Sequence, residues 1–138
     1  MSNMKECPVF GLYAASRQLI KVYTNELEAV ELTYPQYLVI SCLLHKDGVS
    51  VDEIGQELFL DSGTLTPLLK RLEANGLVTR EHSKQDERKR VITLTPDGRN
   101  LEKSLNVLRQ NIQLKFQVSP EEIQQLVQVL TKILLTDI

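Results

Sequence analysis

Apolar side chains recur at intervals of three and four residues over most of the chain, the spacing that gives a helix one buried face. The pattern predicts helices over about 8–30 and 34–45, two more within 50–76 and two within 96–138. Only residues 77–95 depart from it, with two short runs in which apolar and polar residues alternate. The chain is therefore expected to be mainly α with a small β-hairpin, an α+β fold.

The two central helices carry their own start and stop signals. Ser50 followed by Glu53 has the form of a capping box, and Asp61 offers a side-chain oxygen as the next N-cap. Gly76 stands where a left-handed C-cap belongs. Two helices joined by so short a turn are typical of the helix-turn-helix, whose second helix reads the DNA major groove.

The alternating runs 77–81 and 91–95 predict two half-buried strands joined by the polar segment SKQDERKR. Beside a helix-turn-helix, such a basic loop indicates a wing that reaches phosphates or a minor groove. The plainer interpretation is a solvated charged loop, and the preceding helix pair favours the wing. We therefore expect a winged helix-turn-helix with its DNA-binding region at 50–95.

The flanking helices carry more apolar surface than the DNA-binding region 50–95, called the reader below, needs in order to fold alone. The stripes within 8–30 and 96–138 include a final helix whose apolar face is too wide for an exposed terminus. These helices either fold back onto their own domain or pair with a second copy. Because helix-turn-helix proteins commonly bind as twofold dimers, we favour dimerisation helices at 8–30 and 96–138 and a homodimer.

Size and composition narrow the class of protein. At 138 residues with 42% hydrophobic residues, the chain suits one soluble domain spanning 1–138. No apolar run reaches membrane-spanning length and no signal peptide opens the chain, so we expect a cytoplasmic protein without a membrane partner. The two cysteines lack metal-ligand spacing, and no nucleophile–base pair or phosphate loop indicates catalysis. We expect no metal, no cofactor and no enzymatic activity.

Net charge is −2, which at first argues against nucleic acid, but the charge is unevenly distributed. Residues 62–90 hold seven basic and four acidic side chains, whereas the rest of the chain holds nine basic and fourteen acidic. Because phosphate binding depends on the face presented, this local excess favours DNA.

Three segments carry a family resemblance: LTYPQYLVI at 32–40, LFLDSGTLTPLLKRLEANGLVTR at 58–80, and the wing motif at 86–88. Nearly the whole chain resembles the MarR family of winged-helix transcription regulators, and the second segment resembles its OhrR-like, organic-hydroperoxide-sensing branch. The resemblance implies a dimeric regulator, a repressor by expectation, that binds a palindromic operator in double-stranded DNA. It also implies that Asp86 orients Arg88 in the wing. The family pattern implies DNA contacts from residues at the start and outer face of the second helix, and we add basic residues of that helix and of the wing. The predicted DNA-contacting residues are Ser62, Gly63, Thr64, Thr66, Pro67, Lys70, Arg71, Lys84, Asp86, Arg88 and Arg90.

OhrR-like proteins sense peroxide through a cysteine near the start of the first helix, close to two tyrosines of the dimer partner. The tyrosines match Tyr23 and Tyr34. An ungapped alignment places the family cysteine at Val9, whereas this chain has Cys7 two residues earlier. With Pro8 as the first helical residue, Cys7 would be the N-cap, where the helix dipole favours the reactive thiolate.

Oxidation of Cys7 by an organic hydroperoxide is therefore the expected signal. Cys42 is interpreted as a small buried hydrophobe. One alternative keeps DNA binding but replaces the signal with a phenolic or lipophilic ligand bound between the dimerisation helices and the reader. A second alternative is a winged-helix protein-interaction module that does not bind DNA.

Overall fold

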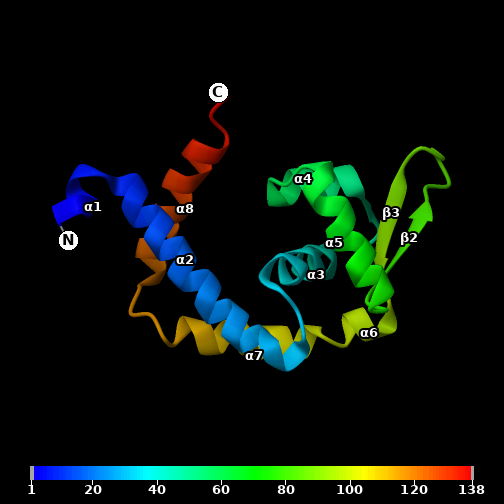
Figure 1. Ribbon diagram of the computed structural model, residues 1–138, viewed down its shortest axis with the longest axis horizontal. Coiled ribbons are helices and arrows are strands. Elements are labelled where there is room, and N and C mark those ends of the chain that lie inside the picture. The colour runs from blue at the N-terminus through cyan, green and yellow to red at the C-terminus, as the bar shows by residue number, and fades with distance from the viewer. Residues whose placement is uncertain (1, 138) are drawn as a thin grey trace.

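Helices make up most of the computed structural model, which describes residues 2–137 (Figure 1). The helices are α1 (Ser2–Glu6), α2 (Pro8–Leu27), the 3-10 turn η1 (Glu28–Val30), α3 (Tyr34–His45), α4 (Val51–Leu58), α5 (Ser62–Ala74), α6 (Pro96–Arg99), α7 (Glu102–Gln113) and α8 (Pro120–Leu134). The strands are β1 (Val49–Ser50), β2 (Val78–His82) and β3 (Arg90–Leu94). They form one antiparallel sheet in the order β1-β3-β2.

The winged-helix fold predicted from the sequence is confirmed. In Figure 1 α4, α5 and the β2–β3 hairpin occupy one side of the molecule, and α1, α2 and α8 the other. α3 lies between them, and α7 connects the two sides. The terminal helices therefore stand apart from the helix-turn-helix.

Local capping signals explain where the helices begin. Thr33 and Gln36 form a full capping box on α3, with the Thr33 hydroxyl accepting the Gln36 N–H and the Gln36 side chain accepting the Thr33 N–H. Ser119 and Glu122 do the same for α8. At α4 the Ser50 hydroxyl accepts the Glu53 N–H, but the Glu53 carboxylate meets the Ser50 hydroxyl instead of its backbone.

One buried cluster extends from α2 to α7 and joins the reader to the helices around it. Its members are Leu27, Leu32, Tyr37, Val39, Ile40, Leu43, Val49, Ile54, Leu65, Leu69, Leu72, Val78, Ile92, Leu94, Leu105, Leu108 and Ile112. None of the α8 residues belongs to this cluster, although α8 has a strongly apolar face.

Several boundaries differ from the sequence predictions. The first long helix ends at Leu27 and tightens into η1, and the helix predicted from residue 96 is divided by a break at Asn100 and Leu101. The hairpin strands are shifted by one residue at β2 and β3, and the pairing of β1 with β3 was not predicted. The short helix α1 before Cys7 was also missed.

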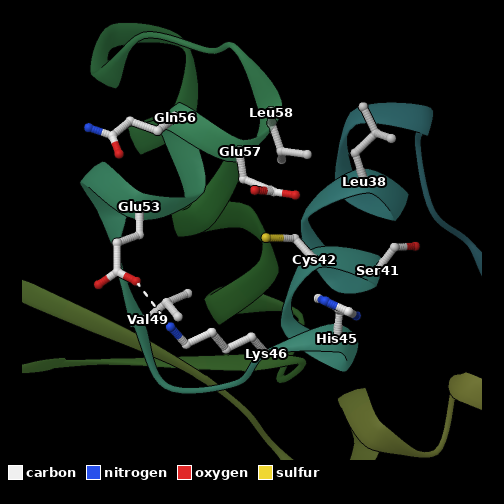
Figure 2. A pocket seen from close by; sticks show the side chains of 10 residues that line it. All are labelled: Leu38, Ser41, Cys42, His45, Lys46, Val49, Glu53, Gln56, Glu57 and Leu58. Carbon is white, nitrogen blue, oxygen red and sulfur yellow. Dashed lines mark ion pairs between the residues drawn. The ribbon is translucent and has the colours of Figure 1, made fainter. Parts of the chain in front are cut away.

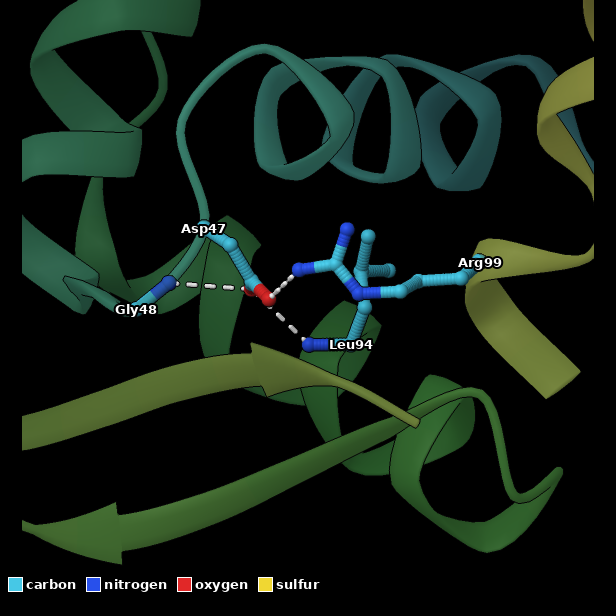
Figure 3. Close-up of polar contacts among 4 residues, drawn as sticks. All are labelled: Asp47, Gly48, Leu94 and Arg99. Atoms are coloured by element: carbon cyan, nitrogen blue, oxygen red, sulfur yellow. Dashed lines mark hydrogen bonds and ion pairs between the residues drawn. The ribbon is translucent and has the colours of Figure 1, made fainter. Parts of the chain in front are cut away.

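Asp47, in the loop between α3 and β1, ties distant parts of the reader together (Figure 3). Its Oδ1 accepts the N–H groups of Gly48 and Leu94, both at 2.9 Å. Its Oδ2 accepts from the Arg99 guanidinium of α6. One carboxylate thus fixes the end of β3 and the start of the segment leading to α7.

The turn between α4 and α5 is closed by backbone contacts. Phe59 has a left-handed conformation with φ 55°, and the Leu60 N–H donates to the Gly55 carbonyl at 2.9 Å. A Cβ at Gly55 would lie 2.7 Å from the Leu60 carbonyl oxygen. Glycine at position 55 is therefore required for the close approach of this turn.

Candidate nucleic-acid interface

Helix α5 begins at Asp61, the predicted N-cap. The Asp61 carboxylate accepts the Thr64 N–H at 2.7 Å. Hydrogen bonds from the Thr64 backbone and side chain hold the pKa of Asp61 below its ordinary value. The cap thus fixes the residue at which α5 begins.

The two faces of α5 differ in burial. Its inner face packs Leu65, Leu69 and Leu72 into the core. The side chains predicted to contact DNA lie on the rest of its surface, with Thr66 half-buried and the others exposed: Ser62, Gly63, Thr64, Pro67, Lys70 and Arg71. The structure therefore collects the predicted α5 set on an accessible surface.

Pro67 lies inside α5 and is exposed. Proline lacks a backbone N–H and cannot donate to the carbonyl four residues earlier, which lowers helix stability. Its position on the accessible face keeps this interruption away from the buried leucines.

The wing is the loop Ser83–Lys89 between β2 and β3, and hydrogen bonds within the loop shape it. The Ser83 N–H donates to the Lys89 carbonyl at 2.8 Å, and the Lys89 N–H donates to the Asp86 carbonyl at 3.0 Å. The His82 Nδ1 lies 2.8 Å from the Glu87 carbonyl oxygen. The wing thus presents its side chains from a closed loop.

Asp86 and Arg88 are coupled, but through the backbone. The Asp86 carboxylate accepts the Arg88 N–H at 3.0 Å, and the described part of the chain shows no ion pair of the Arg88 guanidinium. The predicted orientation of Arg88 by Asp86 therefore acts on the turn, and the guanidinium remains available to a ligand. Three wing side chains of the predicted set, Lys84, Asp86 and Arg88, are exposed, and so is Arg90 at the start of β3.

An ion pair that was not predicted from the sequence joins β2 to α5. Glu73 Oε1 lies 3.2 Å from both the Nε and the Nη2 of Arg80 on β2, and the Arg80 side chain is only 18% exposed. The contact spans seven residues across the helix end, so helical spacing alone could not predict it. It restrains the hairpin relative to the helix it follows.

Cys7 is at the N-cap of α2, as predicted, with Pro8 as the first helical residue. Its thiol is exposed and makes no capping hydrogen bond within the described chain. Val9, the position where the family alignment places the cysteine, is 75% exposed. Both positions therefore lie on accessible surface at the start of α2.

Tyr23 and Tyr34 lie together in one cluster with Tyr37. The ring centroids of Tyr23 and Tyr34 are 5.2 Å apart, and those of Tyr23 and Tyr37 are 5.4 Å apart. Burial, followed by the neighbouring Tyr37 and Tyr34, raises the pKa of Tyr23 to about 12. Burial likewise raises the pKa of Tyr34, so both hydroxyls keep their protons and can donate.

Arg109 of α7 completes the tyrosine cluster and was not predicted. Its Nε donates to the Tyr37 hydroxyl at 2.8 Å, and its Nη2 donates to the Ser41 hydroxyl at 3.4 Å. The guanidinium also lies 5.6 Å from the Tyr37 ring centroid. A signal at the tyrosines would thus reach α3 and α7 together.

Two further properties are stated for residues 2–137. No helix in this range has the length and apolar character needed to cross a membrane. No group of three or more His, Cys, Asp and Glu side chains gathers there in a form that could hold a metal ion.

A capped helix with a polar, basic outer face, followed by a basic hairpin tied to it, defines a winged helix-turn-helix of the DNA-binding class. A family model for the transcriptional regulator SarA/Rot matches residues 19–105. The organic hydroperoxide resistance transcriptional regulator of Bacillus subtilis is 44% identical over 128 residues, which cover 92% of this chain and 86% of the relative.

Solved structures agree with this class. Overoxidized AbfR bound to DNA superposes with a TM-score of 0.79 at 32% identity, covering 96% of this chain and 93% of that one; AbfR comes from Staphylococcus epidermidis. BpsR of Bordetella bronchiseptica superposes with a TM-score of 0.82 at 26% identity, covering 91% of each chain. The chain belongs to the SarA/Rot family of DNA-binding transcriptional regulators and to the OhrR-like branch of the MarR family, as the resemblance implied.

Proposed function

We propose that this chain acts as a homodimeric repressor that binds a palindromic operator and is released when a hydroperoxide oxidises Cys7. The observation that carries the proposal is the pairing of two features. One is the exposed basic surface of α5 and the wing. The other is an exposed thiol at the start of α2, the helix that also carries Tyr23 of the tyrosine cluster.

On DNA, α5 would enter the major groove and the wing would contact the adjacent backbone or minor groove. Lys70 and Arg71 come from α5, and Arg88 comes from the wing, so their contacts would lie on neighbouring parts of the duplex. A dimer would repeat them one helical turn away, which is why the operator would be palindromic.

Exposed apolar side chains on the terminal helices support the homodimer. In α8 the solvent-facing residues include Ile123, Leu126, Val127, Val129, Ile133 and Leu134, each about half exposed. In α2 they include Val9, Phe10, Leu12, Tyr13, Leu19 and Ile20. Apolar surface of this extent on the two terminal helices is typical of an interface, and a second copy of the chain would cover it.

The length of α2 supports a role for a second copy in the proposed redox step. Cys7 and Tyr23 are sixteen residues apart along one helix, a separation of about 24 Å at the helical rise. A thiol at one end of α2 therefore cannot contact the tyrosine cluster of its own chain. An antiparallel partner helix would bring the Cys7 of one protomer to the tyrosines of the other.

In the oxidation, the Cys7 thiol takes one oxygen atom from the hydroperoxide, which leaves as the alcohol. The product is a sulfenic acid, larger than the thiol and with different hydrogen bonds. Donors such as the protonated Tyr23 and Tyr34 hydroxyls would rearrange around it, and Arg109 would pass the change to α7. A shift of these helices would move the two copies of α5 away from one-turn spacing and release DNA.

Two relatives favour peroxide as the signal. One is named as an organic hydroperoxide resistance regulator, and AbfR has been solved on DNA in both reduced and overoxidized forms. Control by a small ligand is the second candidate, because DNA binding by BpsR is regulated by 6-hydroxynicotinic acid.

The test is release of an operator duplex by cumene hydroperoxide, followed by fluorescence anisotropy, for the parent, Cys7→Ser and Cys42→Ser. We expect the parent and Cys42→Ser to release DNA and Cys7→Ser to stay bound. Release that persists in Cys7→Ser would refute Cys7 as the sensor, and control by a small ligand would then be the favoured mechanism. Failure of all three proteins to bind any duplex would refute the reader assignment instead.

A further inference from the structure

A cleft of about 630 Å³ lies between α3 and α4 (Figure 2). None of the residues predicted to contact DNA lines it, and one of its lining residues, Ser41, accepts a hydrogen bond from Arg109 of the tyrosine cluster. The apolar surface of the cleft comes from Leu38 and Cys42 of α3, Val49 of β1 and Leu58 of α4. The volume is in the range of small-molecule sites. The half-buried Cys42 thiol points across the cleft toward α4, so Cys42 is not the fully buried hydrophobe that the sequence predicted.

Two carboxylates of α4, Glu53 and Glu57, line this apolar cleft, and the basic side chains that line it are Lys46 and His45 of the α3 end. With His45 neutral the lining carries a net charge of −1. Glu57 extends from α4 toward α3 beside Cys42, and it forms no ion pair within the described part of the chain (Figure 2). Glu53 pairs only with Lys46, at 3.9 Å and with both side chains largely exposed. Such an exposed pair is weak and can open at little cost.

The environment of the cleft changes the pKa of the Cys42 thiol. Burial, then the carboxylates of Glu57 and Glu53, raise the pKa of Cys42 above its ordinary value. Burial disfavours a charge of either sign beside the thiol, and the two carboxylates disfavour a further negative charge in particular. The same environment suppresses the thiolate, so Cys42 is poorly suited to react with peroxide.

We propose that the α3–α4 cleft binds a lipophilic organic cation, with the apolar part of the ligand against Leu38, Cys42, Val49 and Leu58 and the positive charge beside Glu57. The combination of an apolar floor and an unpaired carboxylate at the rim selects this class over neutral or anionic compounds. The proposal does not depend on oxidation of Cys7.

The test uses two rigid ions of nearly the same shape and opposite charge, tetraphenylphosphonium and tetraphenylborate. Calorimetric titration of the full chain should show binding of the phosphonium and much weaker binding of the borate. Glu57→Gln keeps the shape of the side chain and removes its charge, and it should weaken phosphonium binding about fivefold, the upper range for an exposed charge pair. Glu81→Gln, an exposed glutamate on β2, is the matched control and should leave the affinity unchanged.

Alkylation of Cys42 locates the bound ion. In Cys7→Ser the remaining cysteine is Cys42, and its reaction with N-ethylmaleimide at alkaline pH, followed by mass spectrometry, should slow when the phosphonium is saturating. Equal binding of the two ions would overturn the proposal. So would an unchanged affinity in Glu57→Gln, or an alkylation rate that the phosphonium does not alter. None of these outcomes bears on operator release by peroxide.

Discussion

Replacing Asp47 with alanine should destabilise the reader, because the Asp47 carboxylate accepts hydrogen bonds from three partners: Gly48, Leu94 and Arg99. Its Oδ1 accepts the part-buried Leu94 N–H, its Oδ2 accepts from Arg99, and the Asp47 side chain is only 21% exposed. Alanine would leave the Leu94 N–H without its acceptor at the end of β3.

The magnitude follows from these contacts. An N–H left unsatisfied at a part-buried position costs about 1–3 kcal/mol. The pair with Arg99 adds at most about 1 kcal/mol, since the Arg99 side chain is 56% exposed and solvent screens the interaction. A total loss of about 2–3 kcal/mol corresponds to a fall in Tm of roughly 7–10 °C for a chain of this length.

Thermal unfolding at fixed protein concentration, followed by far-UV circular dichroism, measures the change, because the stability of a dimer depends on concentration. Arg99→Ala separates the ion pair from the backbone contact and should cost at most about 1 kcal/mol. Asp137→Ala, beyond the end of α8, is the control for loss of an aspartate. If Asp47→Ala were no worse than Arg99→Ala, the Leu94 contact would contribute nothing and the reasoning would be wrong.

Three other predictions concern DNA, assembly and pH. Arg88→Ala should weaken binding to specific and random duplexes alike and make the salt slope shallower by about one unit, as measured by anisotropy at several salt concentrations; unchanged affinity at low salt would contradict a wing contact. Leu130→Asp combined with Leu134→Asp should monomerise or unfold the protein in sedimentation experiments, whereas a stable monomer that still bound DNA tightly would argue against the dimer. The lowered pKa of Asp61 means that its cap stabilises the fold above the ordinary aspartate value of 3.8 and is lost as pH falls through the lowered value. The advantage of the parent over Asp61→Ala in urea unfolding should therefore shrink as pH falls below 3.8, and an advantage that did not change with pH would exclude this origin.

Features set by neighbouring residues could be predicted from the sequence. The caps at Thr33, Asp61 and Ser119 involve a hydrogen bond to a residue three positions on, and the left-handed Gly76 follows α5 directly. Each depends on side-chain chemistry within one helical turn, so the residue types alone indicate the geometry. The exposed α5 and wing positions follow from the same periodicity.

Features that join distant residues could not be predicted in this way. β1 has two residues, too few to show alternation, and it exists only because Val49 pairs with Ile92 of β3. The contacts of Asp47 with Arg99 and of Arg109 with Tyr37 cross 52 and 72 residues. The cleft beside Cys42 was missed because the apolar sequence of α3 indicates burial without showing where α4 leaves a gap.

Gly55, inside α4, has a consequence for how the DNA-binding region could be altered. The turn between α4 and α5 closes only because Gly55 places no atom in front of the Leu60 carbonyl oxygen. Any side chain at this position would push the two backbones apart and change the angle between the helices. The absence of a side chain at Gly55 thus determines the direction of α5 relative to α4. The residues on the outer face of α5 do not take part in this contact, so they can be replaced without changing that direction. Redesign of DNA sequence specificity can therefore vary the outer face of α5 but should keep Gly55.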